Sequence, residues 1–250
     1  MANPYFSFKQ FTVWQDQAAM KVTTDACLLG AWASDHLQQH FTVNPVEPAR
    51  APRLADVGTG TGLLAMMIHQ KNPSLYIDGL EIDPQAAQQA LHNVEQAGFQ
   101  QQIQIHTVDV TSFDPAEPYD IIISNPPFYQ DDLKAMEQKR NWAFHDDTLT
   151  LAALFRFISA HLSATGKFFL LLPCRREQEV QALLHSHDLC LVEKTAVKTA
   201  PHSLAHRLLL AGKRGKASTD LLEKEICIGG ETGSYSNRFR ELLTDYYLTL

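Results

Sequence analysis

The sequence predicts an α/β fold in which helices cover both faces of a mostly parallel β-sheet. Apolar strand segments alternate with amphipathic helical segments from residue 53 to about residue 212, the pattern of repeated β–α–β units. A glycine-rich loop follows the first of these strands and opens a helix, as in sheets that bind nucleotides. The 250 residues are enough for one large domain.

The first half of the predicted sheet follows a linker. Residues 44–53 (NPVEPARAPR) are rich in proline and charge, which indicates a connection rather than a strand or helix. The helix after the second strand has Pro84 at its start and Gly98 just past its end, the usual asymmetry of helix ends. The predicted strands are Arg53–Val57, Leu75–Glu81 and Ile103–Val108, and the predicted helices are Leu63–Gln70 and Pro84–Ala97.

The second half continues the alternation. Residues 168–172 are wholly apolar, as expected of a strand buried on both faces. The predicted strands are Tyr119–Ser124, Lys167–Leu172, Leu189–Lys198 and Arg207–Gly212, and the predicted helices are Leu149–Leu162 and Gln178–His187. A sheet of this kind binds ligands at the carboxyl ends of its strands, near the point where the strand order reverses.

The composition of the chain argues against a membrane protein, a secreted protein and a metal-binding protein. No run of about 18 apolar residues is present, so we expect no membrane span, and the N-terminus does not resemble a secretory signal. The cysteines Cys27, Cys174, Cys190 and Cys227 have no metal-binding spacing, which predicts no metal site and favours reduced structural thiols in a cytoplasmic protein.

Basic residues gather locally in an acidic chain. The net charge is −7, which argues against nonspecific nucleic-acid binding. The stretch from Lys198 to Lys216 nevertheless holds five basic residues, two histidines and no acid. Smaller clusters are Lys134, Lys139 and Arg140, and Arg175 with Arg176. These clusters together are compatible with a structured RNA partner, whereas an ordinary solvated face is the better interpretation of any single cluster.

An acid follows each of the first three predicted strands. Asp56 precedes the loop Gly58-Thr59-Gly60-Thr61-Gly62, Glu81 ends the second strand, and Asp109 follows the third. Glycines let the backbone turn sharply close to a ligand, and the second acid can accept hydrogen bonds from ribose hydroxyls. Each acid alone could be a helix cap, the interpretation we adopt for Asp83. The loop by itself leaves a dinucleotide ligand open.

The segment after the fourth strand decides whether the glycine-rich loop binds a dinucleotide or another nucleotide-like ligand. Asn125-Pro126-Pro127-Phe128 directly follows Tyr119–Ser124, at the carboxyl end of a central strand. The two prolines restrict the backbone, and this rigidity suits a site that must align two reactants. The residue types fit methyl transfer to an amino nitrogen.

The chemistry of that transfer explains each residue type. The lone pair of an adenine amino group is delocalised into the ring, so the nitrogen is a poor nucleophile. The side-chain oxygen of Asn125 and the carbonyl of Pro126 can each accept an N–H, favour a pyramidal nitrogen and stabilise its developing positive charge. Pro127 and Phe128 line the substrate side, where the Phe128 ring offers a face for base stacking. No general base is required.

With these residues the sequence resembles class I methyltransferases of the amino-methylating type, which have a Rossmann-like fold. The resemblance covers most of the chain. It implies a seven-stranded, mostly parallel sheet whose last strand is antiparallel, and S-adenosylmethionine as the methyl donor.

The chain ends carry a more specific resemblance. Residues 8–13 (FKQFTV), 21–32 (KVTTDACLLGAW) and 235–248 are similar to the bacterial tRNA1(Val) (adenine-37-N6)-methyltransferases. In that family the stretch matching Lys21 to Asp25 lies over the cofactor, which implies cofactor contacts for Lys21 and Thr24. Thr23 and Thr24 also suit a helix N-cap. Thr23, Ala26 and Cys27 depart from the glycine and small apolar residues expected there.

The resemblance implies the substrate and the domain organisation. The substrate is adenine 37 in the anticodon loop of a valine tRNA, and taking an already unstacked loop base into a pocket costs less than flipping one from a duplex. Residues 1–50 form an N-terminal helical segment over the cofactor, and residues 51–250 form the catalytic core of one domain. The implied cofactor contacts are Lys21, Thr24, Asp56, Gly58, Gly60, Gly62, Glu81, Asp109 and Asn125. We expect a cytoplasmic protein with tRNA as partner, no membrane and no obligate protein partner.

Four alternatives stand beside this reading. A protein glutamine-N5 methyltransferase also uses an Asn-Pro-Pro motif, usually followed by tyrosine rather than Phe128. A DNA adenine methyltransferase would need a target-recognition domain that 250 residues do not provide. An inactive scaffold would not preserve Asn125, and a dehydrogenase would need an acid–base pair for hydride transfer, for which we find no candidate.

Overall fold

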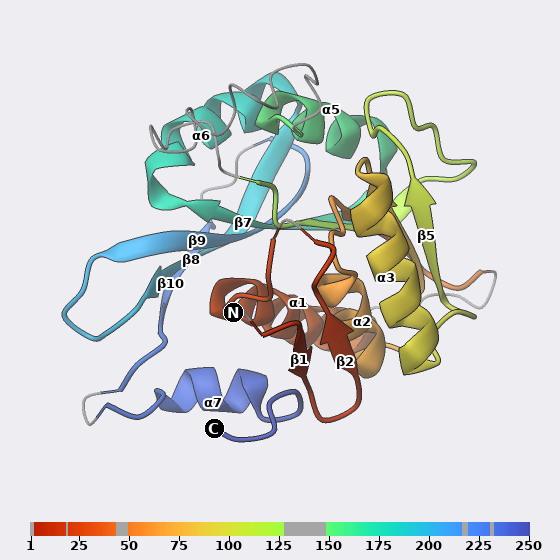
Figure 1. Ribbon diagram of the computed structural model, residues 1–250. Coiled ribbons are helices and arrows are strands. Elements are labelled where there is room, and N and C mark those ends of the chain that lie inside the picture. Colours follow the sequence, from red (N-terminus) through yellow and green to blue (C-terminus); the bar gives the residue numbers. More distant parts are fainter. Residues whose placement is uncertain (1–2, 19, 44–49, 128–148, 217–219, 231–232) are drawn as a thin grey trace, which may run out of the picture.

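The computed structural model is an α/β sandwich built on one large sheet (Figure 1). It describes residues 3–18, 20–43, 50–127, 149–216, 220–230 and 233–250. A separate two-stranded sheet pairs β1 with β2. The large sheet has the order β10-β8-β9-β7-β6-β3-β4-β5. The strands are β1 (Tyr5–Ser7), β2 (Thr12–Trp14), β3 (Arg53–Val57), β4 (Tyr76–Glu81), β5 (Ile103–Thr107), β6 (Tyr119–Ser124), β7 (Leu162–Pro173), β8 (Leu189–Lys198), β9 (Ala205–Arg214) and β10 (Leu222–Cys227).

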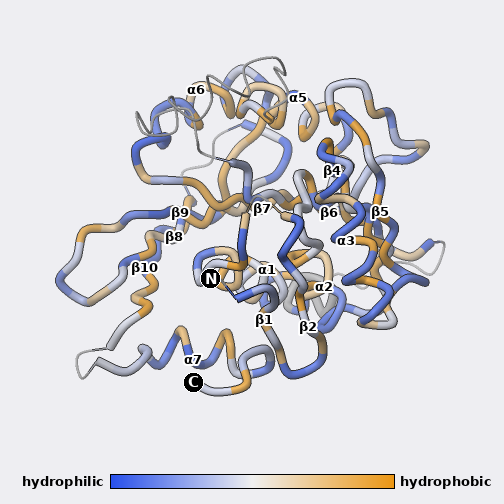
Figure 2. Tube along the Cα trace, viewed as in Figure 1, coloured by the Kyte–Doolittle hydropathy of each residue, from blue (hydrophilic) through white to orange (hydrophobic). Residues whose placement is uncertain are grey.

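Helices cover both faces of this sheet (Figure 1). Helices α1 and α2 pack with the end of α3 on one face, and α5 and α6 cover the other. In Figure 2 the central strands are largely hydrophobic, whereas the helices alternate between hydrophobic and hydrophilic residues. The helices are α1 (Thr24–Val43), α2 (Leu63–Lys71), α3 (Pro84–Ala97), α5 (Leu151–His161), the 3₁₀ turn η2 (Cys174–Arg176), α6 (Glu177–Ser186) and α7 (Asn237–Leu243).

The strand order reverses between β3 and β6. From β3 the chain adds β4 and β5 outward in one direction, and from β6 it adds β7 in the other. The strands β3 and β6 are parallel neighbours, with Asp56 opposite Ile123. Their carboxyl ends therefore lie side by side at the position where open α/β sheets bind ligands. The predicted α/β fold is confirmed.

Strand β9 is antiparallel to both of its neighbours, β7 and β8, as the resemblance implied for the seventh strand. The described sheet has eight strands rather than seven, because β10 pairs in parallel with the outer side of β8. The sequence pattern hides β10, since its residues Leu222–Glu225 are all exposed and give no alternation of apolar and polar residues. Charged side chains of this kind are common on edge strands.

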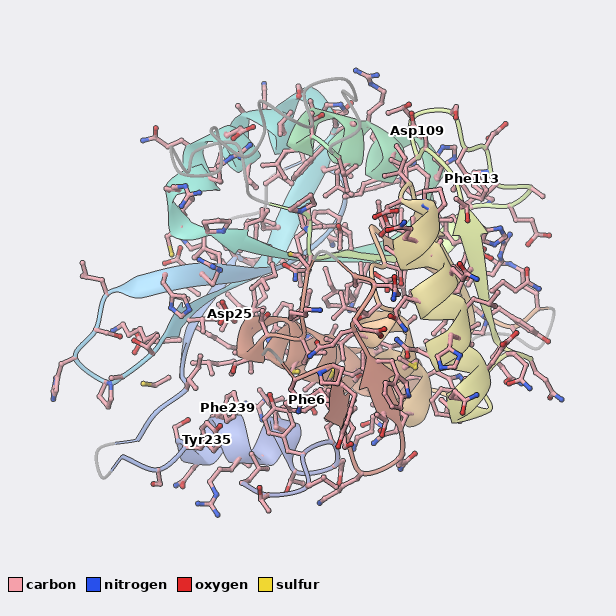
Figure 3. All side chains as sticks on the ribbon, in the orientation of Figure 1. Phe6, Asp25, Asp109, Phe113, Tyr235 and Phe239 are labelled. Atoms are coloured by element: carbon pink, nitrogen blue, oxygen red, sulfur yellow. The ribbon has the colours of Figure 1, made fainter. Side chains whose placement is uncertain are left out.

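The N-terminal segment and the C-terminal helix pack together. The β1–β2 hairpin precedes α1, so the N-terminal segment is not helical throughout. Phe8 forms a β-bridge with Tyr247, and the backbone N–H of Lys9 donates to the carbonyl of Tyr246 at 2.8 Å. Figure 3 shows Phe6 near Tyr235 and Phe239 in this region. Neither the hairpin nor α7 was expected from the sequence.

Two element boundaries differ from the predicted ones. The hydroxyl of Thr150 accepts from the N–H of Ala153, so α5 begins at Leu151 rather than two residues earlier. Strand β7 starts directly after α5 and includes a register shift near its beginning, which makes it longer than predicted.

The four cysteines are free thiols. In the described part of the chain, no helix is both long and apolar enough to cross a membrane.

Candidate active site

A cavity of about 340 Å³ lies where the strand order reverses. The loops after β3, β4, β5 and β6 contribute to its wall, together with the N-termini of α3 and α5. Ala18 and Met20 of the N-terminal segment line it as well. Its volume lies within the usual range of small-molecule sites, about 300–1,000 Å³. The cavity combines apolar walls with polar groups from three strand ends.

The glycine-rich loop is held to the end of β4 by its backbone. The N–H groups of Gly58 and Thr59 both donate to the carbonyl of Leu80, at 2.8 and 3.1 Å. Gly58 and Gly60 have φ values of +72° and +56° and line the cavity. These left-handed conformations favour glycine, and a Cβ at Gly60 would meet no other atom within 4 Å. The loop therefore leaves open space on its cavity side.

Asp56 supports this loop from within the core. Its side chain is fully buried, and its Oδ2 accepts from the hydroxyl of Thr59 at 2.6 Å and from the N–H of Ala65 at 3.2 Å. Burial, with a smaller contribution from the charge of Glu81, raises the pKa of Asp56 to about 7. Asp56 is not among the residues that line the cavity.

Glu81 at the end of β4 faces the cavity with its carboxylate already oriented. Its Oε2 accepts from the N–H of Gly60 at 2.8 Å, and its Oε1 accepts from the N–H groups of Ile82 and Asp83 at 2.9 and 3.0 Å. A carboxylate offers about four acceptor positions. These three backbone donors fix the group and leave acceptor capacity on Oε2 for a ligand hydroxyl.

Two further acids line the same cavity. Asp83 caps α3, since its Oδ1 accepts from the N–H of Gln85 at 2.9 Å, which confirms the capping prediction. Asp109 lies past the end of β5 (Figure 3), and its Oδ1 accepts from the N–H of Thr111 at 2.8 Å. The acids after β4 and β5 thus converge on the cavity, whereas the acid after β3 supports it from behind.

Asn125 brings an unpaired acceptor to the cavity. Its Oδ1 is buried and has no hydrogen-bond partner among the described residues. A buried polar atom without a partner costs free energy, so among the described residues this oxygen is left available to accept a hydrogen bond from a ligand. Pro126 is buried, and Pro127 lines the cavity beside Asn125. Phe128 lies outside the described residues.

The remaining walls are apolar. Side chains from the N-terminus of α3 and from the residues flanking Asp109 face those of Ala153 and Leu149. Such walls suit a flat ring system, because they exclude water from its faces. Sequence reasoning did not single out these residues, which carry no motif and reach the cavity from the strand ends, from the starts of α3 and α5, and from the N-terminal segment. They are Ala18, Met20, Ile82, Ala86, Val108, Val110, Leu149 and Ala153.

The other expected cofactor residues lie around the cavity and do not line it. The ammonium of Lys21 donates to the carbonyl of Gln15. Thr24 begins α1, and the hydroxyl of Thr23 accepts from the N–H of Ala26 at 3.2 Å, which confirms Thr23 as an N-cap. Gly62 has a φ of +79°, which favours glycine at the N-cap of α2, and a Cβ there would make ordinary contact with Ala90 on α3 at 3.5 Å.

The basic stretch from residue 198 to 216 does not form one surface. Arg207 pairs with Pro173 at the carboxyl end of β7, whereas Lys213 pairs with Lys167 in the middle of the same strand. Arg207 therefore lies on the edge of the sheet that carries the cavity, and its Nε is 3.2 Å from Oδ2 of Asp25 on α1.

The opposite end of β9 has a structural role. The guanidinium of Arg214 donates to the carbonyls of Leu162 and Ser159 at 2.7 and 2.5 Å. These bonds fix the turn between α5 and β7. The cluster Lys134, Lys139 and Arg140 lies outside the described residues.

Comparison with known proteins identifies the family. The model of the methyltransferase small domain matches residues 32–186. A tRNA1(Val) (adenine(37)-N6)-methyltransferase from Parabacteroides distasonis is 37% identical over 100% of both chains. Relatives of the same name from Dyadobacter fermentans and Pseudoalteromonas translucida are 39% and 35% identical, each over 98% of this chain and 98% and 99% of their own.

The chain belongs to the tRNA1(Val) (adenine(37)-N6)-methyltransferase family. Solved structures agree at the level of the fold. A predicted O-methyltransferase from Agrobacterium tumefaciens superimposes with a TM-score of 0.66 at 20% identity, over 88% of this chain and 96% of that chain. An S-adenosylmethionine-dependent methyltransferase from Clostridium acetobutylicum gives 0.52 at 12% identity, over 78% and 94%.

S-adenosylmethionine is the methyl donor in the tRNA1(Val) (adenine(37)-N6)-methyltransferase family, and the cavity suits it. Glu81 retains acceptor capacity for a ribose, and the apolar walls suit an adenine. The positive φ of Gly60 leaves room that a side chain would fill. Membership in this family favours the RNA reading over the glutamine-N5 alternative.

Proposed function

We propose that this protein transfers a methyl group from S-adenosylmethionine to N6 of adenine 37 in the anticodon loop of tRNA1(Val). The observation that carries the proposal is the buried Oδ1 of Asn125 at the reversal point of the sheet, which has no hydrogen-bond partner among the described residues. The full-length similarity to relatives of that name supports the substrate. We further propose that the reaction takes place in the cytoplasm.

The cofactor contacts follow from the cavity. Bound S-adenosylmethionine supplies an electrophilic methyl group on a sulfonium. Glu81 accepts from the ribose hydroxyls, Asp109 lies beside the adenine, and Gly58 and Gly60 allow close approach of the backbone. Asp56 and Gly62 act indirectly, because they hold the loop and its helix.

The N-terminal segment completes this site. Ala18 and Met20 line the cavity, and Lys21 and Thr24 follow them directly. We propose that residues 1–50 cover the cofactor and that residues 51–250 form the catalytic core of the same domain. Lys21 and Thr24 then lie near the methionine part of the cofactor.

The residues after β6 hold the target nitrogen. Asn125 Oδ1 and the carbonyl of Pro126 each accept one N–H of the adenine amino group. These acceptors become more favourable as positive charge develops on the nitrogen, so they stabilise the transition state more than the ground state. Pro127 and Phe128 provide the surface on which the base stacks. The proton leaves readily after methyl transfer, so the chain needs no strong base.

One experiment tests the reaction and its substrate together. The purified protein is incubated with methyl-labelled S-adenosylmethionine and, separately, total tRNA, DNA and a protein extract. We expect label in tRNA, recovered as N6-methyladenosine at position 37 of tRNA1(Val). Label that enters only the protein extract would reject the proposal in favour of the glutamine-N5 reaction.

The different positions of Arg207 and Lys213 along β9 give a second test of RNA binding. We propose that Arg207, on the cavity side of the sheet, contacts the RNA backbone, while Lys213 lies too far along β9 to share that contact. Arg207→Glu should weaken tRNA binding and reduce its dependence on salt, and Lys213→Glu is the matched comparison. Equal effects of both changes, or no effect of either, would contradict this placement.

A further inference from the structure

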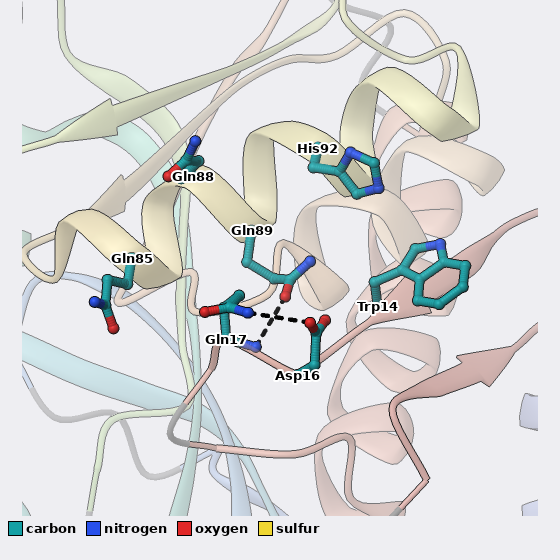
Figure 4. Close-up of a pocket in the computed structure, with 7 residues that line it drawn as sticks. All are labelled: Trp14, Asp16, Gln17, Gln85, Gln88, Gln89 and His92. Atoms are coloured by element: carbon teal, nitrogen blue, oxygen red, sulfur yellow. Dashed lines mark hydrogen bonds between the residues drawn. The ribbon is translucent and has the colours of Figure 1, made fainter.

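A second cavity, of about 550 Å³, lies between α3 and the N-terminal segment (Figure 4). One wall consists of side chains on α3, among them Gln85, Gln88 and His92. The other wall is formed by the residues that follow β2, beginning with Trp14 and Asp16. In Figure 4 Trp14 lies next to His92 at one end of this groove, and Gln85 lies at the other end.

Buried amides hold the two walls together. Asn93, with no exposed side-chain surface, accepts from the N–H of Trp14 at 2.9 Å and donates to its carbonyl at 2.8 Å. Gln89 is also buried, and its Oε1 accepts from the N–H of Gln17 at 3.1 Å. The backbone of the N-terminal wall is thus fixed on α3, and the groove is preformed.

The groove presents an exposed aromatic surface. Trp14 is 38% exposed although its backbone is fully anchored. Tyr5, on the paired strand, is 41% exposed, and its ring centroid lies 5.2 Å from that of Trp14. Exposed, rigidly held aromatic rings are the platforms on which unpaired bases stack.

The other lining groups indicate a nucleobase rather than an anion or an apolar chain. No lysine or arginine lines the groove in the described structure, and Asp16 adds a negative charge, so a phosphate is disfavoured. Apart from Trp14 the lining side chains are all polar, which disfavours an aliphatic ligand. Glutamine amides offer paired donors and acceptors that match base edges, and a carboxylate can accept from an exocyclic amino group.

The groove and the cofactor cavity are lined by neighbouring residues on both walls. Gln17 lines the groove, and Ala18, the next residue, lines the cavity. On α3, Gln85 lines the groove and Ala86 lines the cavity. A nucleotide in this groove therefore lies beside the cavity that the proposed substrate base enters.

We propose that this groove binds a second unpaired base of the RNA substrate, which stacks on Trp14 and is read at its edge by Gln85 and Gln88. This inference rests on the proposed function for the identity of the RNA. It makes the groove a determinant of substrate choice that acts outside the methyl-transfer site.

The test uses the full-length protein and the anticodon stem–loop of the tRNA that the wild type methylates. Trp14→Ala and Gln88→Ala should each raise KM for this RNA, the former about tenfold or more because stacking on one aromatic ring contributes about that much. We expect kcat and the Kd for S-adenosylmethionine to remain unchanged. Trp14→Phe should recover most of the loss, and ultraviolet cross-linking should join the RNA to Trp14.

Matched controls separate the groove from a general surface effect. Gln96→Ala changes an exposed glutamine on α3 outside the groove, and Tyr76→Ala removes an exposed aromatic ring at the start of β4. Both should leave KM unchanged. An unchanged KM in Trp14→Ala and Gln88→Ala, a matching rise in the controls, or a rise in the Kd for S-adenosylmethionine would each overturn the inference.

Two results distinguish this inference from the proposed function. If the wild type methylates no RNA, the proposed function fails, and cross-linking of the stem–loop to Trp14 still tests the groove by itself. If methylation of a protein substrate depends on Trp14 and that of RNA does not, the groove binds a peptide and the inference is wrong.

Discussion

Ser124 donates a hydrogen bond from its hydroxyl to the carbonyl of Val57, at 2.7 Å, in the buried interior. Ser124 ends β6 and Val57 ends β3, so this side-chain bond adds to the backbone pairing of the two strands from which Asn125 and the glycine-rich loop depart. The contact thereby helps to fix the cofactor loop relative to the methyl-transfer residues.

Ser124→Ala should therefore affect both stability and activity. The Val57 carbonyl loses its side-chain donor in a buried place, and we expect the free energy of unfolding to fall by about 1 kcal/mol. The value of kcat should fall as well, because Asn125 is adjacent. Urea denaturation and steady-state kinetics measure the two effects. Ser74→Ala, at an exposed position, is the control, and equal stability of both variants would count against the role of this bond.

Glu81→Gln should weaken binding of S-adenosylmethionine about tenfold or more. The amide nitrogen of glutamine would replace one of the two oxygens that accept backbone N–H groups, and hydrogen bonds to a charged acceptor contribute about 1.5–3 kcal/mol. Isothermal titration calorimetry gives the Kd. Glu95→Gln, at an exposed position on α3, should bind like the wild type. If the Kd of Glu81→Gln stays within twofold of that of the wild type, Glu81 is not a ribose ligand.

Asn125→Ala should lower kcat about 100-fold or more, the usual loss when one preorganised transition-state hydrogen bond is removed. The Kd for S-adenosylmethionine should change much less, because the assigned bonds strengthen only as charge develops. Asn125→Asp keeps an acceptor oxygen and should retain more activity than the alanine variant. Losses of equal size in kcat and in cofactor affinity would contradict the assigned role.

Asp56 should make stability depend on pH. Its pKa is about 7 in the folded protein, compared with an ordinary value of 3.8, so the folded state holds its proton longer than the unfolded state. The contribution of Asp56 to the free energy of unfolding therefore decreases as pH rises from about 4 to about 7 and stays constant above that range.

The comparison with Asp56→Asn isolates this effect. The difference in unfolding free energy between the wild type and the variant should shift against the wild type as pH increases from 5 to 7.5. Urea denaturation at several pH values measures it. A difference that is flat, or that changes in the wild type's favour, would show that Asp56 does not titrate in this window.

The repeated β–α–β units are the part of the fold that the sequence predicts. Residues 121–123 of β6 and 168–172 of β7 are wholly apolar because both faces of the sheet are covered there, and this pattern is visible without a structure. Strand β10 is not visible, since Glu223, Lys224 and Glu225 on the edge of the sheet are all exposed. The hairpin is also hidden, because β1 and β2 have only three residues each.

The residues of the candidate site also divide into those that the sequence identifies and those that it does not. Residues with distinctive chemistry, such as Glu81 and Asn125, could be selected from their positions after strands. Val108 and Met20 could not be selected, because an apolar side chain is recognised as part of a cavity wall only when its neighbours in space are known. Nor could the sequence separate Arg207 from Lys213, since the distance between them becomes significant only when β9 is seen as one extended strand.

The bridge between Phe8 and Tyr247 has a consequence for how the protein is made. Phe8 and Lys9 bond to Tyr247 and Tyr246, which the ribosome adds more than two hundred positions later. During synthesis Phe8 therefore lacks the contact with the Tyr247 ring after the central strands have been translated. The nascent chain thus exposes apolar surface near Phe8 until the segment that contains Tyr247 has been synthesised.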